Sequence, residues 1–233
     1  KIITVTRNLY NQYPRQYWLM ILGVVIATAG GSMIWPFMLI YASGKLNMPL
    51  SSVAALISIN AGTGLASSLI AGALADRIGR RPVILLSLAA YVVAFSGFLL
   101  ATSAWLLILL RGLAGLFTAG LVPAILSSVG DLAAKNRRAQ WIGIVNGGTS
   151  VGWILGPLWG GLLYDRFGYV VPFAGSIAMA FGALLLAAFL IPETHKFAAH
   201  PTRLHSAWTH GLQALPARPT FFLLLLITFG VMF

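Results

Sequence analysis

Long apolar runs separated by short polar connections dominate the sequence. Six runs are long enough to cross a hydrocarbon core about 30 Å thick, which takes roughly 20 residues as a helix. Each run is continuously apolar with interspersed Gly, Ser and Thr, whereas alternation with a period of two would favour barrel strands. The pattern predicts an all-α integral membrane protein that spans the bilayer at Trp18–Tyr41, Val53–Ala75, Pro82–Thr102, Trp105–Val129, Trp141–Tyr164 and Val170–Ile191.

A polar segment of different character follows the sixth run. Residues 192–219 contain all four histidines of the chain, and a seventh apolar run begins at Phe221. The histidines recur every five residues, which does not place them on one helical face, so we expect solvated positions and no metal site. We predict a six-span domain over residues 1–191, a cytoplasmic linker over 192–219 and the start of a seventh span over 220–233.

Charge is scarce and distributed unevenly. Lys and Arg number 15 against four Asp and Glu, which gives a formal net charge of +11, and the chain has no cysteine. Twelve of the 15 basic residues lie before the first span or in connections on that same side of the membrane, while the opposite connections hold Lys45 and Arg166. The positive-inside rule therefore places the N-terminus in the cytoplasm. Because topology accounts for the basic residues, we do not expect nucleic-acid binding.

An internal repeat links the second and fifth spans. The pattern G-x-L-x-D-R-x-G occurs at residues 72–79 and again at 161–168, a shift of 89 residues. The two copies end spans that finish on opposite sides of the membrane. They therefore predict two three-helix repeats of inverted topology, an arrangement typical of transporters.

Asp76 stands at the C-terminal end of its predicted helix, where the helix dipole disfavours a carboxylate by roughly 0.3–1 kcal/mol. Arg80 and Arg81 are near in sequence and could compensate for it. In the same connection Gly79 permits a tight reversal, and Pro82 suits the first turn of the next helix. A turn with topology-anchoring arginines and a charge cluster with a further role are both compatible with these residues.

Two further features lie inside the spans. Gly148, Gly152, Gly156 and Gly160 recur every fourth residue and form a smooth stripe on which a neighbouring backbone can approach closely. Arg111 is the one charged residue within the six runs. An unpaired arginine near the bilayer centre costs about 2.5–3.5 kcal/mol on insertion scales. It therefore either extends toward the outer surface or faces the bundle interior.

The motifs together resemble the major facilitator superfamily. Residues 72–81 match the family's loop pattern G-x-L-x-D-R-x-G-R-R/K at every position, and "PET" at 192–194 follows the sixth span. Residues 111–115 are similar to the R-x-x-Q-G element, with Ala114 in place of Gln. Residues 152–161 match G-x-x-x-G-P-x-x-G-G, which within the family marks the drug/proton antiporters. The resemblance implies a six-helix bundle of two inverted repeats, forming the N-terminal half of such a transporter.

The resemblance also implies roles for particular residues. It implies a conformational latch formed by Gly72, Asp76, Arg77, Gly79, Arg80, Arg81 and Asp131. It implies an antiporter motif, formed by Gly152, Gly156, Pro157, Gly160 and Gly161, that bends the helix and closes against the other half. Cavity or proton-coupling roles fall to Arg111 and Gly115, and for Arg111 the resemblance implies either an influence on proton exchange or the binding of an anionic group. We add Trp35, Asn60, Asn146 and Thr149 as candidates for lining the substrate cavity.

The function expected from the resemblance is proton-coupled export of small organic or drug-like compounds by alternating access, in a bacterial cytoplasmic (inner) membrane. Membrane lipid, the small-molecule substrate, protons and a C-terminal six-span half of the same chain are the expected partners, and no cofactor is expected. A proton-coupled symporter or a uniporter for a nutrient on the same fold is the alternative, and a sensor on a transporter scaffold stays open. An enzyme is disfavoured because no His, Glu or Cys lies in any span. The first span has no acidic residue, which leaves the proton-binding carboxylate unlocated.

Overall fold

The structure is a computed structural model that describes residues 13–193. The predicted linker and seventh span lie outside the described residues, apart from Pro192 and Glu193. The helices of the described range are α2 (Arg15–Gly44), α3 (Leu50–Ile78), α4 (Arg80–Leu100), α5 (Ala104–Thr118), α6 (Leu121–Leu132), α7 (Arg138–Phe167) and α8 (Val170–Leu190). All six spans predicted within the described range are helical, so the prediction of an all-α fold is confirmed.

The fourth predicted span is not one continuous helix. It is divided into α5 and α6 at Ala119 and Gly120. Pro123 explains the break, because a proline ring collides with the carbonyl group four residues earlier and lacks the N–H that would bond to it. That carbonyl belongs to Ala119. The prediction missed this consequence of a proline in an otherwise apolar run.

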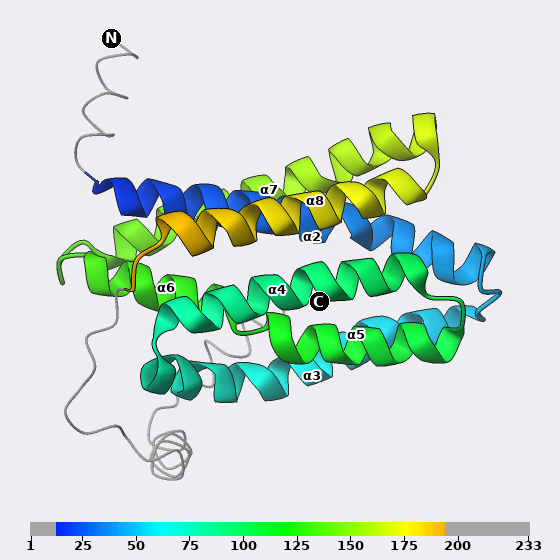
Figure 1. Cartoon of the computed structure of the whole chain (residues 1–233), viewed down its shortest axis with the longest axis horizontal. Helices are drawn as coiled ribbons and strands as arrows, with labels where there is room; N and C mark the ends of the chain where they lie inside the picture. The colour runs from blue at the N-terminus through cyan, green and yellow to red at the C-terminus, as the bar shows by residue number, and fades with distance from the viewer. Residues whose placement is uncertain (1–12, 194–233) are drawn as a thin grey trace, which may run out of the picture. The chain divides into compact units, whose positions relative to one another are not determined.

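The helices form two layers (Figure 1). One layer contains α2, α7 and α8, and the other contains α3, α4, α5 and α6, with α4 packed against α8 between them. Helix α2 packs mainly on α7 and α8, and α5 packs mainly on α3 and α4. If the first three spans are exchanged with the last three, α5 takes the place of α2, α7 that of α3 and α8 that of α4. The contacts of α2 with α7 and α8 then become those of α5 with α3 and α4, which the structure also contains. The packing therefore has the symmetry that the inverted repeat predicts.

The two copies of the sequence repeat also end in the same backbone conformation. Gly79 follows α3 with φ 97° and ψ 161°, and Gly168 follows α7 with φ 76° and ψ −175°. They are the two glycines with positive φ among the described residues. This region of φ and ψ is essentially restricted to glycine. The repeat is therefore a structural one, and the predicted tight reversal at Gly79 is confirmed.

Length and composition support most of the predicted crossings. Four segments are long and apolar enough to cross a membrane, namely α2, α4, α8 and the combined α5 and α6. Helix α3 is a fifth if its two parts, which bend by 41° between Ser68 and Ile70, form one span. Helix α7 has 30 residues but is not among them, because its seven glycines and several polar residues lower its mean hydropathy.

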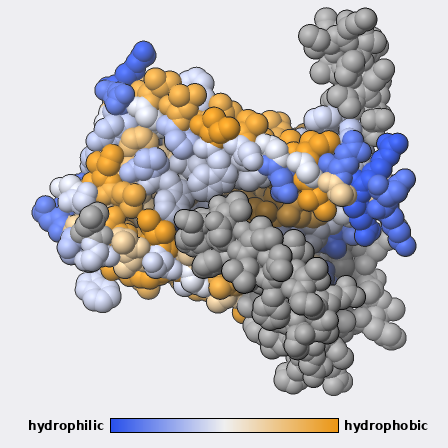
Figure 2. Space-filling model, turned by 180° about the vertical axis from the view of Figure 1, so that it is seen from behind, coloured by the Kyte–Doolittle hydropathy of each residue, from blue (hydrophilic) through white to orange (hydrophobic). Residues whose placement is uncertain are grey.

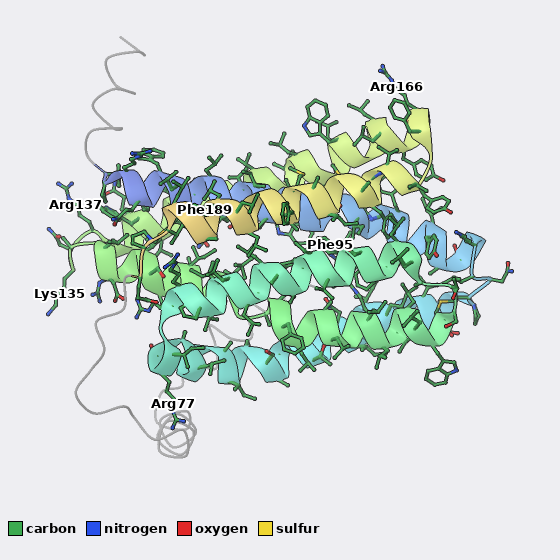
Figure 3. The ribbon with its side chains drawn as sticks, viewed as in Figure 1. Arg77, Phe95, Lys135, Arg137, Arg166 and Phe189 are labelled. Carbon is green, nitrogen blue, oxygen red and sulfur yellow. The ribbon has the colours of Figure 1, made fainter. Side chains whose placement is uncertain are left out.

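Charged residues gather at the ends of the bundle. Figure 2 shows hydrophobic residues over its flanks and most strongly hydrophilic ones at its ends. In Figure 3, Arg77, Lys135 and Arg137 lie at the end where α2 begins, and Arg166 lies at the opposite end. The asymmetry of basic residues read from the sequence is thus present in the fold.

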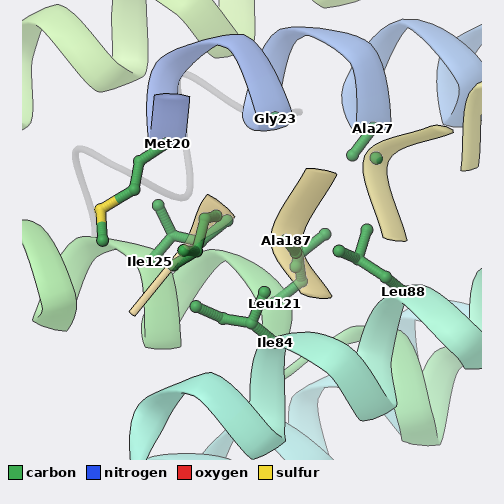
Figure 4. A pocket seen from close by; sticks show the side chains of 10 residues that line it. Met20, Gly23, Ala27, Ile84, Leu88, Leu121, Ile125 and Ala187 are labelled. Carbon is green, nitrogen blue, oxygen red and sulfur yellow. The ribbon is translucent and has the colours of Figure 1, made fainter. Parts of the chain in front are cut away.

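The interior contains an apolar cluster toward each end. In one cluster the Tyr17 hydroxyl donates to the carbonyl oxygen of Trp141 at 2.8 Å, and Phe98 and Phe173 are fully buried in the other. A gap of about 10 Å³ remains in the first cluster, near Met20 and Ala187 (Figure 4). An apolar gap of this size is a packing defect and not a ligand site.

The repeat makes a prediction at Gly168. Nothing lies within 4 Å of a Cβ built there, so Gly168→Ala meets only the backbone strain of its positive φ. We expect the change to lower the free energy of unfolding by about 1–3 kcal/mol. Gly182→Ala, which also enters open space but within a regular helix, is the matched control and should raise it by about 0.5–1 kcal/mol, because alanine is the better helix former. Unfolding of the purified protein in detergent micelles measures both, and equal effects would contradict the account.

Candidate functional site

A cavity of about 150 Å³ lies between the two layers. All helices of the bundle except α8 contribute to its wall. Phe95, one of its residues, lies midway along the bundle (Figure 3). The lining residues are Ala27, Thr28, Gly31, Ser32, Trp35, Asn60, Tyr91, Phe95, Arg111, Ala114, Thr118, Val122, Thr149 and Trp153.

Arg111 is the one charged residue in this wall. Its side chain is buried, with 5% of its surface exposed, and the predicted alternative of an outward-reaching arginine is not what the structure shows. The guanidinium carbon lies 4.4 Å from the centre of the Trp35 ring and 5.8 Å from that of Phe98. Such contacts stabilise a cation through the negative face of the ring. Within residues 13–193, no carboxylate forms an ion pair with it.

The backbone that carries Arg111 is fixed from α3. Asn60 donates from Nδ2 to the carbonyl oxygen of Arg111 at 3.2 Å. Gly115, one turn further along α5, lets α3 come this close, because a Cβ there would stand 3.0 Å from Asn60 Nδ2 and closer still to Thr63. Gly115 therefore packs α3 against α5 behind the cavity wall.

The structure brings together most of the residues proposed for the cavity. Trp35, Asn60, Thr149 and Arg111 all line it, whereas Asn146 is exposed and does not. The prediction missed Tyr91, which is part of the wall. Helical spacing gave a usable signal for some of the other residues. Thr118 stands seven residues from Arg111, and Thr28 and Ser32 stand seven and three residues before Trp35, so they share faces with the residues already proposed.

The glycine stripe of α7 faces α2. A Cβ at Gly152 would lie 3.0 Å from the backbone N of Ala29, one at Gly156 would lie 2.8 Å from that of Met33, and one at Gly160 would lie 3.0 Å from the Met33 carbonyl oxygen. Ser32 donates across this contact to the Gly152 carbonyl oxygen at 3.1 Å. Of the two interpretations of the stripe, helix packing inside the bundle is therefore the one that the structure supports for these three glycines.

The implied closure against another half finds no support at those glycines, because α2 already occupies the space beside them. Gly161 differs, since nothing lies within 4 Å of a Cβ built there, and Pro157 is half-buried within α7.

The predicted latch residues lie at the end of the bundle where α3 turns into α4. Arg80 pairs with Asp131 of α6 and donates to the Ser127 carbonyl oxygen. Arg81 donates from Nη2 to the Ala188 carbonyl oxygen in the last turn of α8, at 2.6 Å. An arginine at the end of a helix satisfies free carbonyl groups and suits the negative end of the helix dipole.

Glu193 is the residue of this cluster that the sequence did not identify as functional. Its two carboxylate oxygens accept from the backbone N–H groups of Arg80 and Arg81 at 3.2 and 3.1 Å. It therefore caps the N-terminus of α4, where a carboxylate is favoured. A Cβ at Gly79 would lie 3.0 Å from Glu193 Cδ, so the glycine also gives the carboxylate room.

Asp76 does not join the cluster that the resemblance implied. It is exposed, as are Gly72 and Arg77, and the ion pair of Arg80 is with Asp131. The physical reason is that α3 continues to Ile78, which leaves Asp76 on the outer surface of its last turn. Glu193 and Asp131, not Asp76, are the carboxylates that contact the α3–α4 turn in the described part of the chain.

Comparison with known proteins identifies the family. The sequence profile of the Major Facilitator Superfamily matches residues 20–233. The chain belongs to the major facilitator superfamily. This confirms the resemblance drawn from the motifs and the fold class, and it agrees with the expectation that the chain is not an enzyme, because the superfamily consists of transporters.

Curated relatives in the superfamily include transporters and resistance proteins. The uncharacterized MFS-type transporter YhjO of Bacillus subtilis is 30% identical over 97% of this chain and 55% of its own length. Multidrug resistance protein 2 of the same species is 26% identical over 96% of this chain and 56% of its own length. Tetracycline resistance protein class C of Escherichia coli is 30% identical over 66% of this chain and 40% of its own length. The chain thus spans about half the length of these relatives at most.

Solved structures share the fold at low sequence identity. A crystal structure of the peptide transporter POT in complex with sulfate matches with a TM-score of 0.71 and 19% identity, over 94% of this chain and 47% of that one. The crystal structure of the human organic anion transporter MFSD10 matches with a TM-score of 0.64 and 20% identity, over 79% and 49%. At these identities the likeness establishes the major facilitator fold alone.

The α2–α7 contact makes a prediction. Gly156→Ala places a methyl group against the α2 backbone, which cannot move aside as a flexible side chain could, so we expect about 1–3 kcal/mol of destabilisation. Gly147→Ala on the same helix meets open space and should raise the free energy of unfolding by about 0.5–1 kcal/mol, because alanine is the better helix former. Detergent unfolding compares the two variants. A neutral Gly156→Ala would show that α7 does not pack on α2 in this way.

Proposed function

We propose that the complete protein is a secondary active transporter that exports small organic or drug-like compounds in exchange for protons. The observation that carries the proposal is the cavity between the two layers, in which Arg111 is held buried beside Trp35. In major-facilitator transporters substrate sites lie near the midplane between two halves, and exchange of access moves one half against the other. Residues of this half would form one wall of that site.

Export is favoured over uptake by two observations. The full G-x-x-x-G-P-x-x-G-G sequence at residues 152–161 is typical of the antiporter branch. Several relatives are named as multidrug or tetracycline resistance proteins. The glycines of this sequence contribute by holding α7 tightly on α2, which makes this wall of the site rigid.

The cluster at the α3–α4 turn is proposed as a conformational latch. It joins the start of α4 to the end of α6 through Asp131 and to the end of α8 through Glu193. The exposed Asp76 is then available to a helix of the C-terminal six-span half. Basic residues gather at this end of the bundle, which supports a cytoplasmic position for it and for the N-terminus. Bacterial relatives support placement in the bacterial cytoplasmic membrane.

Uniport or symport of a nutrient is the second candidate, and one observation favours its uniport form. No carboxylate lines the cavity within residues 13–193, so a proton site for antiport has to be supplied by another part of the protein. A uniporter needs no such group.

The direction of coupling tests the proposal. We expect the complete protein in proteoliposomes to accumulate tetracycline when the vesicle interior is acidic, and to do so beyond protein-free vesicles. Asp131→Asn, which removes the partner of Arg80, should abolish most of this uptake. Asp165→Asn is the control, because it removes an exposed carboxylate that forms no ion pair within residues 13–193. This variant should retain the uptake. Accumulation driven by an acidic exterior would instead establish symport.

A further inference from the structure

The cavity has an excess of positive charge. Arg111 is its one ionised residue, and the four acidic residues of the chain, Asp76, Asp131, Asp165 and Glu193, all lie at the ends of helices outside the cavity. A buried cation without a counter-charge is unfavourable in a low-dielectric interior, and it is retained where it pairs with another group or has a function. The ring contact with Trp35 offsets part of the cost and does not neutralise the charge.

The Ser and Thr hydroxyl groups of the cavity wall donate within the bundle. Thr28 donates to the Val24 carbonyl oxygen at 2.7 Å, Thr118 donates to that of Ala114 at 2.7 Å, and Thr149 donates to that of Val145 at 3.1 Å. Ser32 donates to the Gly152 carbonyl oxygen. For the guanidinium N–H groups of Arg111, by contrast, no hydrogen bond occurs with any described residue. Arg111 therefore holds the charged donors of this wall, and no described residue occupies them.

The rest of the wall suits a flat apolar group. Trp35, Tyr91, Phe95 and Trp153 all line the cavity. Its volume of about 150 Å³ equals that of engineered apolar cavities that bind benzene. The guanidinium carbon lies 4.4 Å from the centre of the Trp35 ring. The N–H edges of a guanidinium match the two oxygens of a carboxylate.

We infer that the cavity selects organic anions, with Arg111 pairing with a carboxylate and the aromatic side chains enclosing an adjoining ring. The inference rests on the proposal that this cavity is the substrate site, and it narrows the substrate class from small organic compounds to aromatic monoanions. It assigns Arg111 to direct substrate binding and Trp35 to holding the guanidinium in place.

Three ring-matched probes of different charge test this inference. Benzoate, benzamide and benzylammonium are titrated at pH 7 against the complete protein in nanodiscs, without a pH gradient. We expect benzoate to bind about 10- to 100-fold more tightly than benzamide, as for a hydrogen bond to a charged group, and benzylammonium to bind most weakly. Arg111→Gln should reduce the benzoate-to-benzamide ratio to about one, whereas Arg111→Lys should retain part of it. Partial loss of folded protein does not change this ratio, since both probes are measured on one sample.

Arg166→Gln is the matched control, because it removes an exposed arginine at the end of α7, and it should leave the ratio unchanged. Tighter binding of benzylammonium than benzoate, or a ratio that Arg111→Gln does not alter, would overturn the inference. The same protein in proteoliposomes separates this from the proposed function. Proton-driven transport of a drug-like probe without anion preference refutes the anion inference alone, and anion preference without proton-driven transport refutes the proposed antiport alone.

Discussion

The bundle has to hold one guanidinium, that of Arg111, among helices whose outer faces are apolar. Burial of this group costs free energy unless its surroundings compensate, and Trp35 provides partial compensation through its ring face. The position of Arg111 in turn depends on α3, because Asn60 bonds to its carbonyl oxygen and Gly115 allows that approach. The symmetry-related contact, in which α7 packs on α2 through its glycines, sets the opposite wall. The cavity is the space between the two layers that remains between these close contacts, α3 on α5 and α7 on α2.

The end of the bundle is held by a different kind of interaction. Helix α4 begins where α8 ends, and each supplies the other with the charge that its terminus favours. Glu193 accepts from the first N–H groups of α4, and Arg81 donates to a carbonyl group in the last turn of α8. Both helix dipoles are thereby compensated. The pairing joins the two repeats at the contact between α4 and α8, which the pseudo-symmetry maps onto itself.

Much of this architecture could be predicted from the sequence. Apolar runs gave the helices, and the repeated G-x-L-x-D-R-x-G pattern gave the symmetry, because its final glycine is needed for a backbone conformation that other residues avoid. The break at Gly120 was missed although Pro123 marks it. The contacts of Glu193 and Tyr91 could not be predicted, because they join residues far apart in sequence whose proximity depends on how helices pack. The assignment of Asp76 to the Arg80 cluster failed to match the structure for a related reason, since the last turn of α3 decides which way its side chain points.

The central claim is that Arg111 gives an accessible cavity a positive charge, and the reactivity of one introduced thiol tests it most directly. The chain has no cysteine, so Thr149→Cys adds a single thiol to the cavity wall. The rate at which this thiol reacts is measured with an anionic and with a cationic methanethiosulfonate reagent of similar size. Each rate is divided by the rate at which the same reagent reacts with a small thiol in solution. The account predicts that the anionic reagent is favoured, and that adding Arg111→Gln removes the preference. An equal or faster cationic reaction, unchanged by Arg111→Gln, would contradict it.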